Sequence, residues 1–165
     1  MKILFAGGGT GGHTFPIIAV ARELKKIDPS INLYFIGPKK EVVPSDLEKE
    51  GIKVKRVSSG KIRRYGGLKP TLSNIIDLLI RIPLGTIQSF VYLFFISPDI
   101  VFSKGGYGAI PATIAARILQ IPIFLHESDI SPGVANRFLS KFALEIFTSF
   151  PKTEFFPQEK TILVG

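Results

Sequence analysis

A glycine-rich segment follows the first apolar run of the chain, Ile3-Leu4-Phe5-Ala6. The segment reads Gly7-Gly8-Gly9-Thr10-Gly11-Gly12-His13 and contains the G-x-G-x-x-G spacing. Glycines at this spacing let the backbone turn sharply and approach a phosphate at the start of a helix. So many glycines exceed what a tight turn needs, and this favours a phosphate-binding loop over a turn of purely structural meaning.

The same spacing is found in dinucleotide-binding folds, which place an acidic residue at the end of the second strand. Here that strand ends in Ile36-Gly37-Pro38-Lys39-Lys40, which contains no carboxylate. The two lysines could instead accept the 2′-phosphate of NADP. An NADP-binding oxidoreductase domain therefore stays open as an alternative.

His13 stands at the start of the helix that follows the glycines. The positive end of a helix dipole disfavours a protonated imidazole. A neutral imidazole beside a phosphate site could act as a general base toward a hydroxyl. A capping or packing histidine is the equally simple alternative.

Two further segments follow apolar strands and could contribute to the same site: Lys104-Gly105-Gly106-Tyr107-Gly108 and His126-Glu127-Ser128-Asp129. Glu127 could bind sugar hydroxyls or orient a base, or it could simply fix its loop. Asp129 and Ser131 are also suitable N-caps for a helix beginning at Pro132.

Alternating apolar runs and helical patterns position these loops and predict a Rossmann-like, doubly wound parallel sheet. The expected strands are 2–6, 32–36, 53–57, 99–102, 123–125, 145–148 and 161–164. The expected helices are 15–27, 44–50, 71–96, 109–119 and 132–142. In such a sheet the strand order reverses between the first and fourth strands, and ligands bind there. Pro16, Pro111 and Pro132 predict three helix N-termini at this edge, favouring an anionic ligand.

A basic segment, 54–70, leads into the long apolar helix 71–96, which we expect to bend at Pro83. The segment carries Lys61, Arg63, Arg64 and Lys69. Asp77 and Arg81 interrupt the apolar run, so we interpret the helix as a surface helix with an apolar face. Basic residues beside such a face favour an anionic membrane surface over nucleic acid, for which no known motif is present.

The composition fits one domain over residues 1–165, with a net charge of +8 that favours an anionic partner. The absence of cysteine excludes a disulfide scaffold and a thiolate metal site. No Asp-x-Asp motif is present, and we predict neither a metal nor another cofactor. No secretory signal is visible.

Several blocks together resemble the MurG family, bacterial transferases that add N-acetylglucosamine to the lipid-linked muramyl-peptide precursor of peptidoglycan. They are Gly8–His13, Gly105-Gly106-Tyr107, Ile121-Pro122, Leu125-His126-Glu127, Pro132–Arg137 and Ser149-Phe150-Pro151. The resemblance spans essentially the whole chain.

The resemblance implies the acceptor-binding, N-terminal domain of a two-domain GT-B enzyme, with the donor-binding C-terminal domain absent. It implies inverting transfer from UDP-GlcNAc to lipid I at the cytoplasmic face of the bacterial membrane. His13 would be the base and Glu127 a second catalytic residue. Gly9, Thr10, Gly11 and Gly12 would meet the donor, and Gly105, Gly106, Tyr107 and Asn136 the acceptor.

The family commonly reads His-Glu-Gln-Asn where this chain has His126-Glu127-Ser128-Asp129. The family's asparagine touches the donor, so we place Asp129 among the substrate-binding residues, with a changed contact. The isolated chain is expected to be inactive. An acceptor-binding, membrane-docking subunit of a two-part glycosyltransferase is an alternative.

Overall fold

A computed structural model describes residues 1–8, 11–39, 46–61, 68–151 and 155–165, without the side chains of 68–71. Seven parallel strands form one sheet in the order β3-β2-β1-β4-β5-β6-β7. They are β1 Lys2–Ala6, β2 Asn32–Pro38, β3 Lys53–Val57, β4 Ile100–Ser103, β5 Ile123–Glu127, β6 Glu145–Thr148 and β7 Thr161–Leu163. The predicted fold class and the reversal of strand order between β1 and β4 are confirmed.

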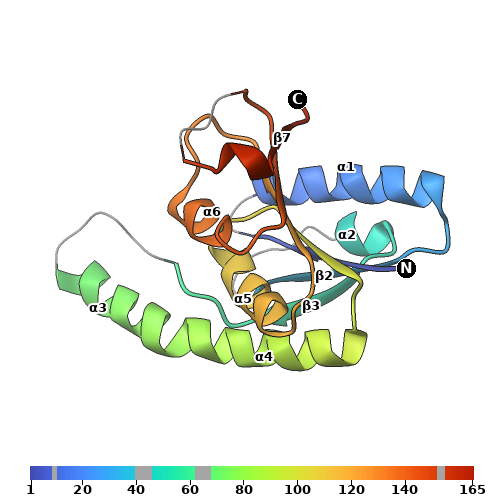
Figure 1. The fold of residues 1–165 in the computed structure, drawn as a ribbon. Coiled ribbons are helices and arrows are strands. Elements are labelled where there is room, and N and C mark those ends of the chain that lie inside the picture. The colour runs from blue at the N-terminus through green and yellow to red at the C-terminus, as the bar shows by residue number, and fades with distance from the viewer. Residues whose placement is uncertain (9–10, 40–45, 62–67, 152–154) are drawn as a thin grey trace.

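Helices cover both faces of this sheet (Figure 1). They are α1 Gly11–Ile27, α2 Asp46–Lys49, α3 Leu68–Ile76, α4 Ile82–Ile96, α5 Ile110–Ile118 and α6 Val134–Leu139. A π-helical turn, Asp77–Arg81, joins α3 to α4. Short 3₁₀ turns cover Tyr107–Ala109 and Gln158–Lys160.

Alternate residues of the strands build two cores, as the period of a strand requires. Ile3 and Phe5 of β1 pack with Ile17 of α1 and Leu47 of α2. On the other face, the larger core contains Leu4 and Ala6 together with buried residues of α4, α5 and α6. The sheet is therefore the middle layer of three, and its carboxyl edge is left for loops.

The predicted helix 71–96 differs from the observed one in its start and in its interruption. It begins at Leu68, and it widens to a π-helical turn before Pro83. The Ile82 N–H donates to the carbonyl of Asp77, five residues back. Proline has no N–H to donate and its ring crowds the carbonyl four residues back, so a wider turn ahead of Pro83 relieves both problems.

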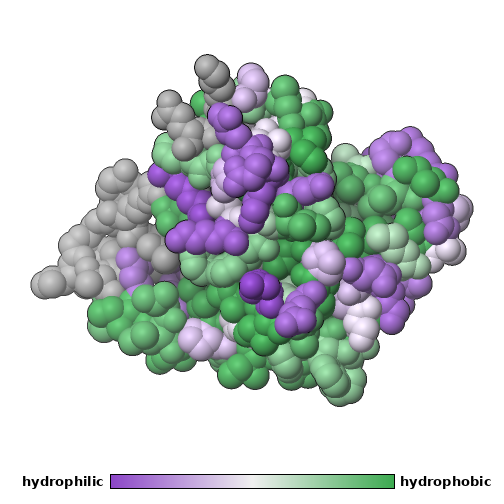
Figure 2. Space-filling model, in the orientation of Figure 1, coloured by the Kyte–Doolittle hydropathy of each residue, from purple (hydrophilic) through white to green (hydrophobic). Residues whose placement is uncertain are grey.

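One face of α4 packs on the domain, through Ile82, Gly85, Ser89 and Leu93. Much of the remaining surface of α3, the π turn and α4 is apolar and exposed (Figure 2). Its exposed apolar residues include Leu72, Ile75, Leu78, Leu79, Ile80, Leu84, Ile87, Phe94 and Phe95. Among the described residues, Leu72–Ile96 is the one helix with the length and composition to cross a membrane. Of its most apolar stretch, 22% is buried.

Two glycines bring segment 58–61 directly against this helical layer. A Cβ on Gly85 would lie 1.8 Å from the carbonyl oxygen of Ser58, and a Cβ on Gly60 would lie 2.6 Å from Cβ of Asp77. Neither position has room for a side chain without a backbone shift.

We predict that Gly85→Ala lowers the free energy of unfolding by about 1–3 kcal/mol, despite alanine's better helix propensity. Urea denaturation followed by circular dichroism measures this change. Gly133→Ala is the matched control, because nothing lies within 4 Å of a Cβ there. An unchanged or raised stability of Gly85→Ala would contradict the close packing of α4 on segment 58–61.

Candidate functional site

Three loops meet at the carboxyl edge of the sheet, where the strand order reverses. The first follows β1 and contains the glycine-rich segment, the second is Lys104–Gly108 after β4, and the third is the segment of Ser128 and Asp129 after β5. The first ends in α1, which begins at Gly11 and so contains His13 in its first turn. Pro16 is therefore inside α1 and not in its first turn as predicted, because the last glycines of the loop are themselves helical. Gly9 and Thr10 lie outside the described residues. Gly12 is the second residue of α1 and is exposed.

A buried carboxylate ties the second and third loops together. Glu127 is 3% exposed, and its Oε1 accepts a hydrogen bond from the Asp129 N–H at 2.9 Å. Its Oε2 accepts a second from Nδ2 of Asn136 at 2.9 Å. Oδ1 of Asn136 accepts the N–H of Gly106 at 3.3 Å. Glu127 therefore acts on the second loop through Asn136.

Two of the three glycines of the second loop have conformations that other residues rarely adopt. Gly105 and Gly106 have φ values of +86° and +77°. A Cβ on Gly105 would lie 1.7 Å from Oδ1 of Asn136. A Cβ on Gly106 would lie 2.3 Å from the carbonyl oxygen of Gly8 and 3.1 Å from Nε2 of His13. The first two loops are thus in direct contact at His13.

Lys104 is a buried cation at the centre of this arrangement. The residue is 2% exposed, and its Nζ donates to Oγ of Ser128 at 3.0 Å. Burial lowers the pKa of its ammonium, while the nearby carboxylates of Glu127 and Asp129 oppose that shift. One buried positive charge therefore lies in the electrostatic field of two carboxylates.

The pKa of His13 is lowered, chiefly by burial and then by the positive charge of Lys104. Three smaller effects raise this pKa: a hydrogen bond with the Lys104 backbone and the negative charges of Glu127 and Asp129. The neutral imidazole expected from the sequence is supported, although its main causes are burial and a lysine. Nδ1 of His13 is buried and has no hydrogen-bond partner among the described residues.

His126 differs from His13 in its surroundings. Its ring stacks on Phe102 with the centroids 6.2 Å apart. Burial and Lys104 lower its pKa to about 4. An aromatic contact within the sheet is the role that this geometry supports.

The expected caps of the sixth helix are wrong. Helix α6 begins at Val134, and its N-cap is Gly133, without a side-chain hydrogen bond. The N–H of Asp129 bonds to Glu127, while Oγ of Ser131 accepts from Arg137 at 3.4 Å. The third loop therefore bonds to Glu127, and the backbone is still extended at Gly133, so that the helix begins at Val134.

The predicted basic patch is described only in part. Arg63 and Arg64, and the side chain of Lys69, lie outside the described residues. Nζ of Lys61 lies 5.7 Å from the centroid of the Tyr107 ring. Tyr107 thus faces the β3 side of the loops. Among the residues that the structure describes, no cluster of His, Cys, Asp and Glu could hold a metal ion.

A family model, described as the glycosyltransferase family 28 N-terminal domain, matches residues 3–148. The chain belongs to this family. The match covers all three loops and α6, and it favours the glycosyltransferase interpretation over the dinucleotide one.

Curated relatives extend over the whole chain. An N-acetylmuramyl-(pentapeptide) pyrophosphoryl-undecaprenol N-acetylglucosamine transferase of Shouchella clausii is 44% identical, over 99% of this chain and 45% of its own length. A transferase of the same name from Treponema pallidum is 39% identical, over 98% of this chain and 41% of its own length. The chain therefore spans less than half the length of these relatives.

Solved structures agree with the family. MurG of Acinetobacter baumannii matches with a TM-score of 0.77 and 26% identity, over 98% of this chain and 44% of that one. A UDP-GlcNAc 2-epimerase of Neisseria meningitidis shares the fold, with a TM-score of 0.63 and 19% identity.

Sequence reasoning assigned no role to Lys104 or to its contact with Ser128. The signal was a lysine placed between an apolar strand and two glycines, where a solvent-exposed residue would have been the ordinary expectation. The departure from the family at Ser128-Asp129 acquires a physical meaning here, because Lys104 donates a hydrogen bond to the serine and the charge of the aspartate favours the protonated form of Lys104.

We predict that Lys104→Met raises the pKa of His13, since it removes a charge that opposes protonation and leaves the burial intact. Asp129→Asn should move this pKa in the opposite direction. The chain contains only two histidines, so an NMR titration of the imidazole signals, assigned with His13→Gln, follows both residues.

The exposed Lys141→Gln is the charge-matched control and should change neither titration. His126, whose pKa Lys104 also lowers, should shift upward in Lys104→Met. A folded Lys104→Met chain in which His13 titrates as in the unmodified chain would show that the lysine does not set its protonation.

Proposed function

We propose that this chain is the acceptor-binding half of a UDP-GlcNAc-dependent transferase that glycosylates the lipid-linked muramyl-pentapeptide diphosphate, lipid I. The observation that carries the proposal is the contact of a half-buried His13, whose pKa is lowered, with Gly106 of the second loop, within the matched family domain. The named activity of the curated relatives, at up to 44% identity, supports these substrates.

In this proposal the acceptor sugar hydroxyl attacks the anomeric carbon of UDP-GlcNAc. The bond from that carbon to the UDP oxygen breaks, UDP departs with the bonding electrons, and the configuration inverts. His13 takes the proton of the attacking hydroxyl, for which its lowered pKa keeps it in the accepting form at neutral pH.

Glu127 acts in this proposal as a positioning residue. Its two oxygens already accept hydrogen bonds from Asp129 and Asn136, and it is buried. Its effect on the reaction is to fix Gly106 against His13. Gly9, Thr10, Gly11, Gly12 and Asp129 remain the proposed donor contacts, with the rest of the donor site on a domain outside this chain.

The departing UDP would be stabilised by backbone N–H groups at the start of α1 and by the Lys104 charge behind it. The exposed apolar surface of α3 and α4 would rest on an anionic membrane at its cytoplasmic face. Lys61, Arg63, Arg64 and Lys69 would supply the positive charges beside it.

The test is calorimetric binding of a soluble short-chain lipid I analogue to the chain. We predict saturable binding, and loss of it in Gly105→Ala, because a Cβ there displaces Asn136. Gly133→Ala is the control and should bind normally. Circular dichroism of both variants separates lost binding from lost folding.

NADPH serves as the second titrant. If NADPH bound and the analogue did not, the acceptor site would be rejected. The glycine loop would then be a dinucleotide-binding loop. If the analogue bound Gly105→Ala as tightly as it binds the unmodified chain, the second loop would not take part in acceptor binding.

A further inference from the structure

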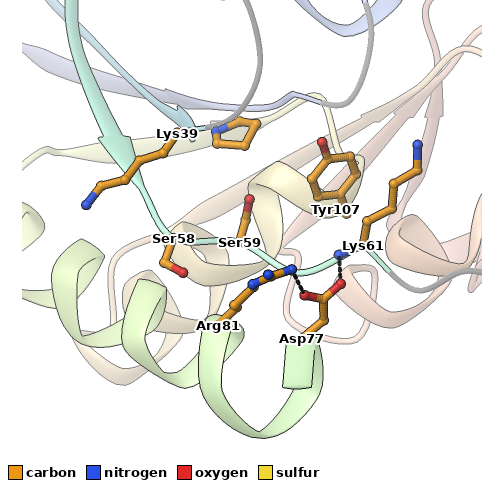
Figure 3. A pocket seen from close by; sticks show the side chains of 8 residues that line it. Lys39, Ser58, Ser59, Lys61, Asp77, Arg81 and Tyr107 are labelled. Atoms are coloured by element: carbon orange, nitrogen blue, oxygen red, sulfur yellow. Dashed lines mark hydrogen bonds and ion pairs between the residues drawn. The ribbon is translucent and has the colours of Figure 1, made fainter. Parts of the chain in front are cut away.

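The second loop contacts two different parts of the carboxyl edge. Tyr107, near its end, lines a pocket of about 260 Å³ between the segment after β3 and the π turn (Figure 3). Lys104, its first residue, is not among the described residues that line this pocket. Its Nζ instead donates to Oγ of Ser128 at 3.0 Å, in the third loop. The role of Lys104 therefore belongs to the β5 side of the edge.

Two separate hydrogen-bonded connections join the second loop to the third. The first passes through Asn136 and Glu127 and ends at the Asp129 N–H, which Glu127 binds at 2.9 Å. The second is the hydrogen bond from Lys104 to Ser128. Because Ser128 and Asp129 are adjacent in the chain, the two connections close a ring. This ring fixes the backbone of the third loop against the second.

The side chain of Asp129 differs from that of Glu127 in its accessibility. Asp129 is exposed, and its carboxylate has no hydrogen-bond partner among the described residues. Its negative charge acts on both Lys104 and His13, since it raises the pKa of each. Asp129 is therefore an exposed charge with a fixed backbone, at the same edge as His13.

An exposed carboxylate is an unfavourable neighbour for a bound diphosphate. Like charges repel across a protein surface by an amount that depends on their distance and on the local dielectric. A cation near Asp129 reduces this repulsion, and Lys104 is such a cation. Lys104 is 2% exposed, so salt screens its charge less than the charge of a surface lysine. The buried lysine therefore offsets the charge of the exposed acid.

A carboxylate also binds what an anion-binding loop does not. It accepts hydrogen bonds only, and hydrogen bonds to an ionised group are roughly twice as strong as those between neutral groups. A nucleotide sugar presents hydroxyl groups beside its diphosphate, and an N-acetylated sugar adds an amide N–H. An acid whose charge is offset by a buried cation can therefore bind the sugar without opposing the diphosphate.

We propose that Asp129 is a specificity-determining residue that accepts a hydrogen bond from the sugar of the nucleotide-sugar donor, and that Lys104 is the positioning residue that makes this acid compatible with the donor's diphosphate. The proposal rests on the transferase function above and deepens its donor contact. The two residues depend on each other, because without Lys104 the charge of Asp129 opposes an anion.

The experiment titrates the chain with UDP and, separately, with UDP-GlcNAc, and it follows the amide signals of Gly106 and Ser128 by NMR. The pH is held above the range in which His13 titrates, so that all variants carry a neutral imidazole. Lys104→Met should weaken UDP binding about tenfold, the order expected for one unit charge near an anion. Adding Asp129→Asn to Lys104→Met should restore most of this loss, since it removes the uncompensated acid.

The sugar contact has a readout of its own, the ratio of the two affinities. Asp129→Asn alone should strengthen UDP binding, because a repelling charge is lost. It should also lower the preference for UDP-GlcNAc over UDP several-fold, because the sugar loses a charged acceptor. Lys141→Gln removes an exposed lysine and is the matched control. It should change neither the affinities nor their ratio.

Ser128→Ala separates the charge of Lys104 from its hydrogen bond. This substitution removes the hydrogen-bond partner and leaves the charge, so it should weaken UDP binding less than Lys104→Met does. Equal effects of the two substitutions would overturn the proposal. So would a Lys104→Met defect that Asp129→Asn does not restore, because the lysine would then act on the fold alone. Should Lys104→Met fail to fold, an unchanged affinity ratio in Asp129→Asn would still reject the sugar contact.

This proposal and the acceptor function fail separately. If the lipid I analogue bound and neither UDP nor UDP-GlcNAc did, the acceptor function would stand and the role of Asp129 would be rejected. If UDP bound with the predicted dependence on Lys104 and Asp129 and the analogue did not bind, the compensated pair would stand and the acceptor would be rejected.

Discussion

The buried carboxylate of Glu127 is the constraint on which the carboxyl edge of this domain depends. It ends β5, holds the third loop through the Asp129 N–H, and reaches the second loop through Asn136. A buried carboxylate with one partner removed carries a large desolvation cost, so the loops and α6 form as one unit. In that arrangement Gly105 lies against Asn136 and Gly106 lies against His13.

The charges around that constraint explain how a basic chain keeps the imidazole of His13 neutral. Lys104 compensates Glu127 and Asp129 from beneath the loops, and together with burial it disfavours a second positive charge on His13. The same division occurs at the π turn, where Asp77 neutralises part of the charge of Arg81 inside the fold.

Much of this was predictable from local sequence. The apolar runs gave the strands nearly to the residue, because a strand buried on both faces carries a continuous apolar signal. The glycine spacing located the first loop and His13. The contacts of Asn136 and Lys104 were not predictable, since they join residues distant in sequence. The π turn was missed because Pro83 alone indicates a bend without its geometry. Helix α6 was overextended at both ends, since the apolar spacing continues beyond the residues that are helical.

The most direct test of this account is UDP-GlcNAc-dependent transfer to a lipid I analogue by a chimaera. This chimaera joins residues 1–165 to the remaining length of the Shouchella clausii relative. The account predicts transfer by the unmodified chimaera and a loss of about 10²–10⁴-fold in kcat for His13→Ala, the range typical of a general base. A chimaera that binds the analogue and retains full turnover without His13 would contradict it.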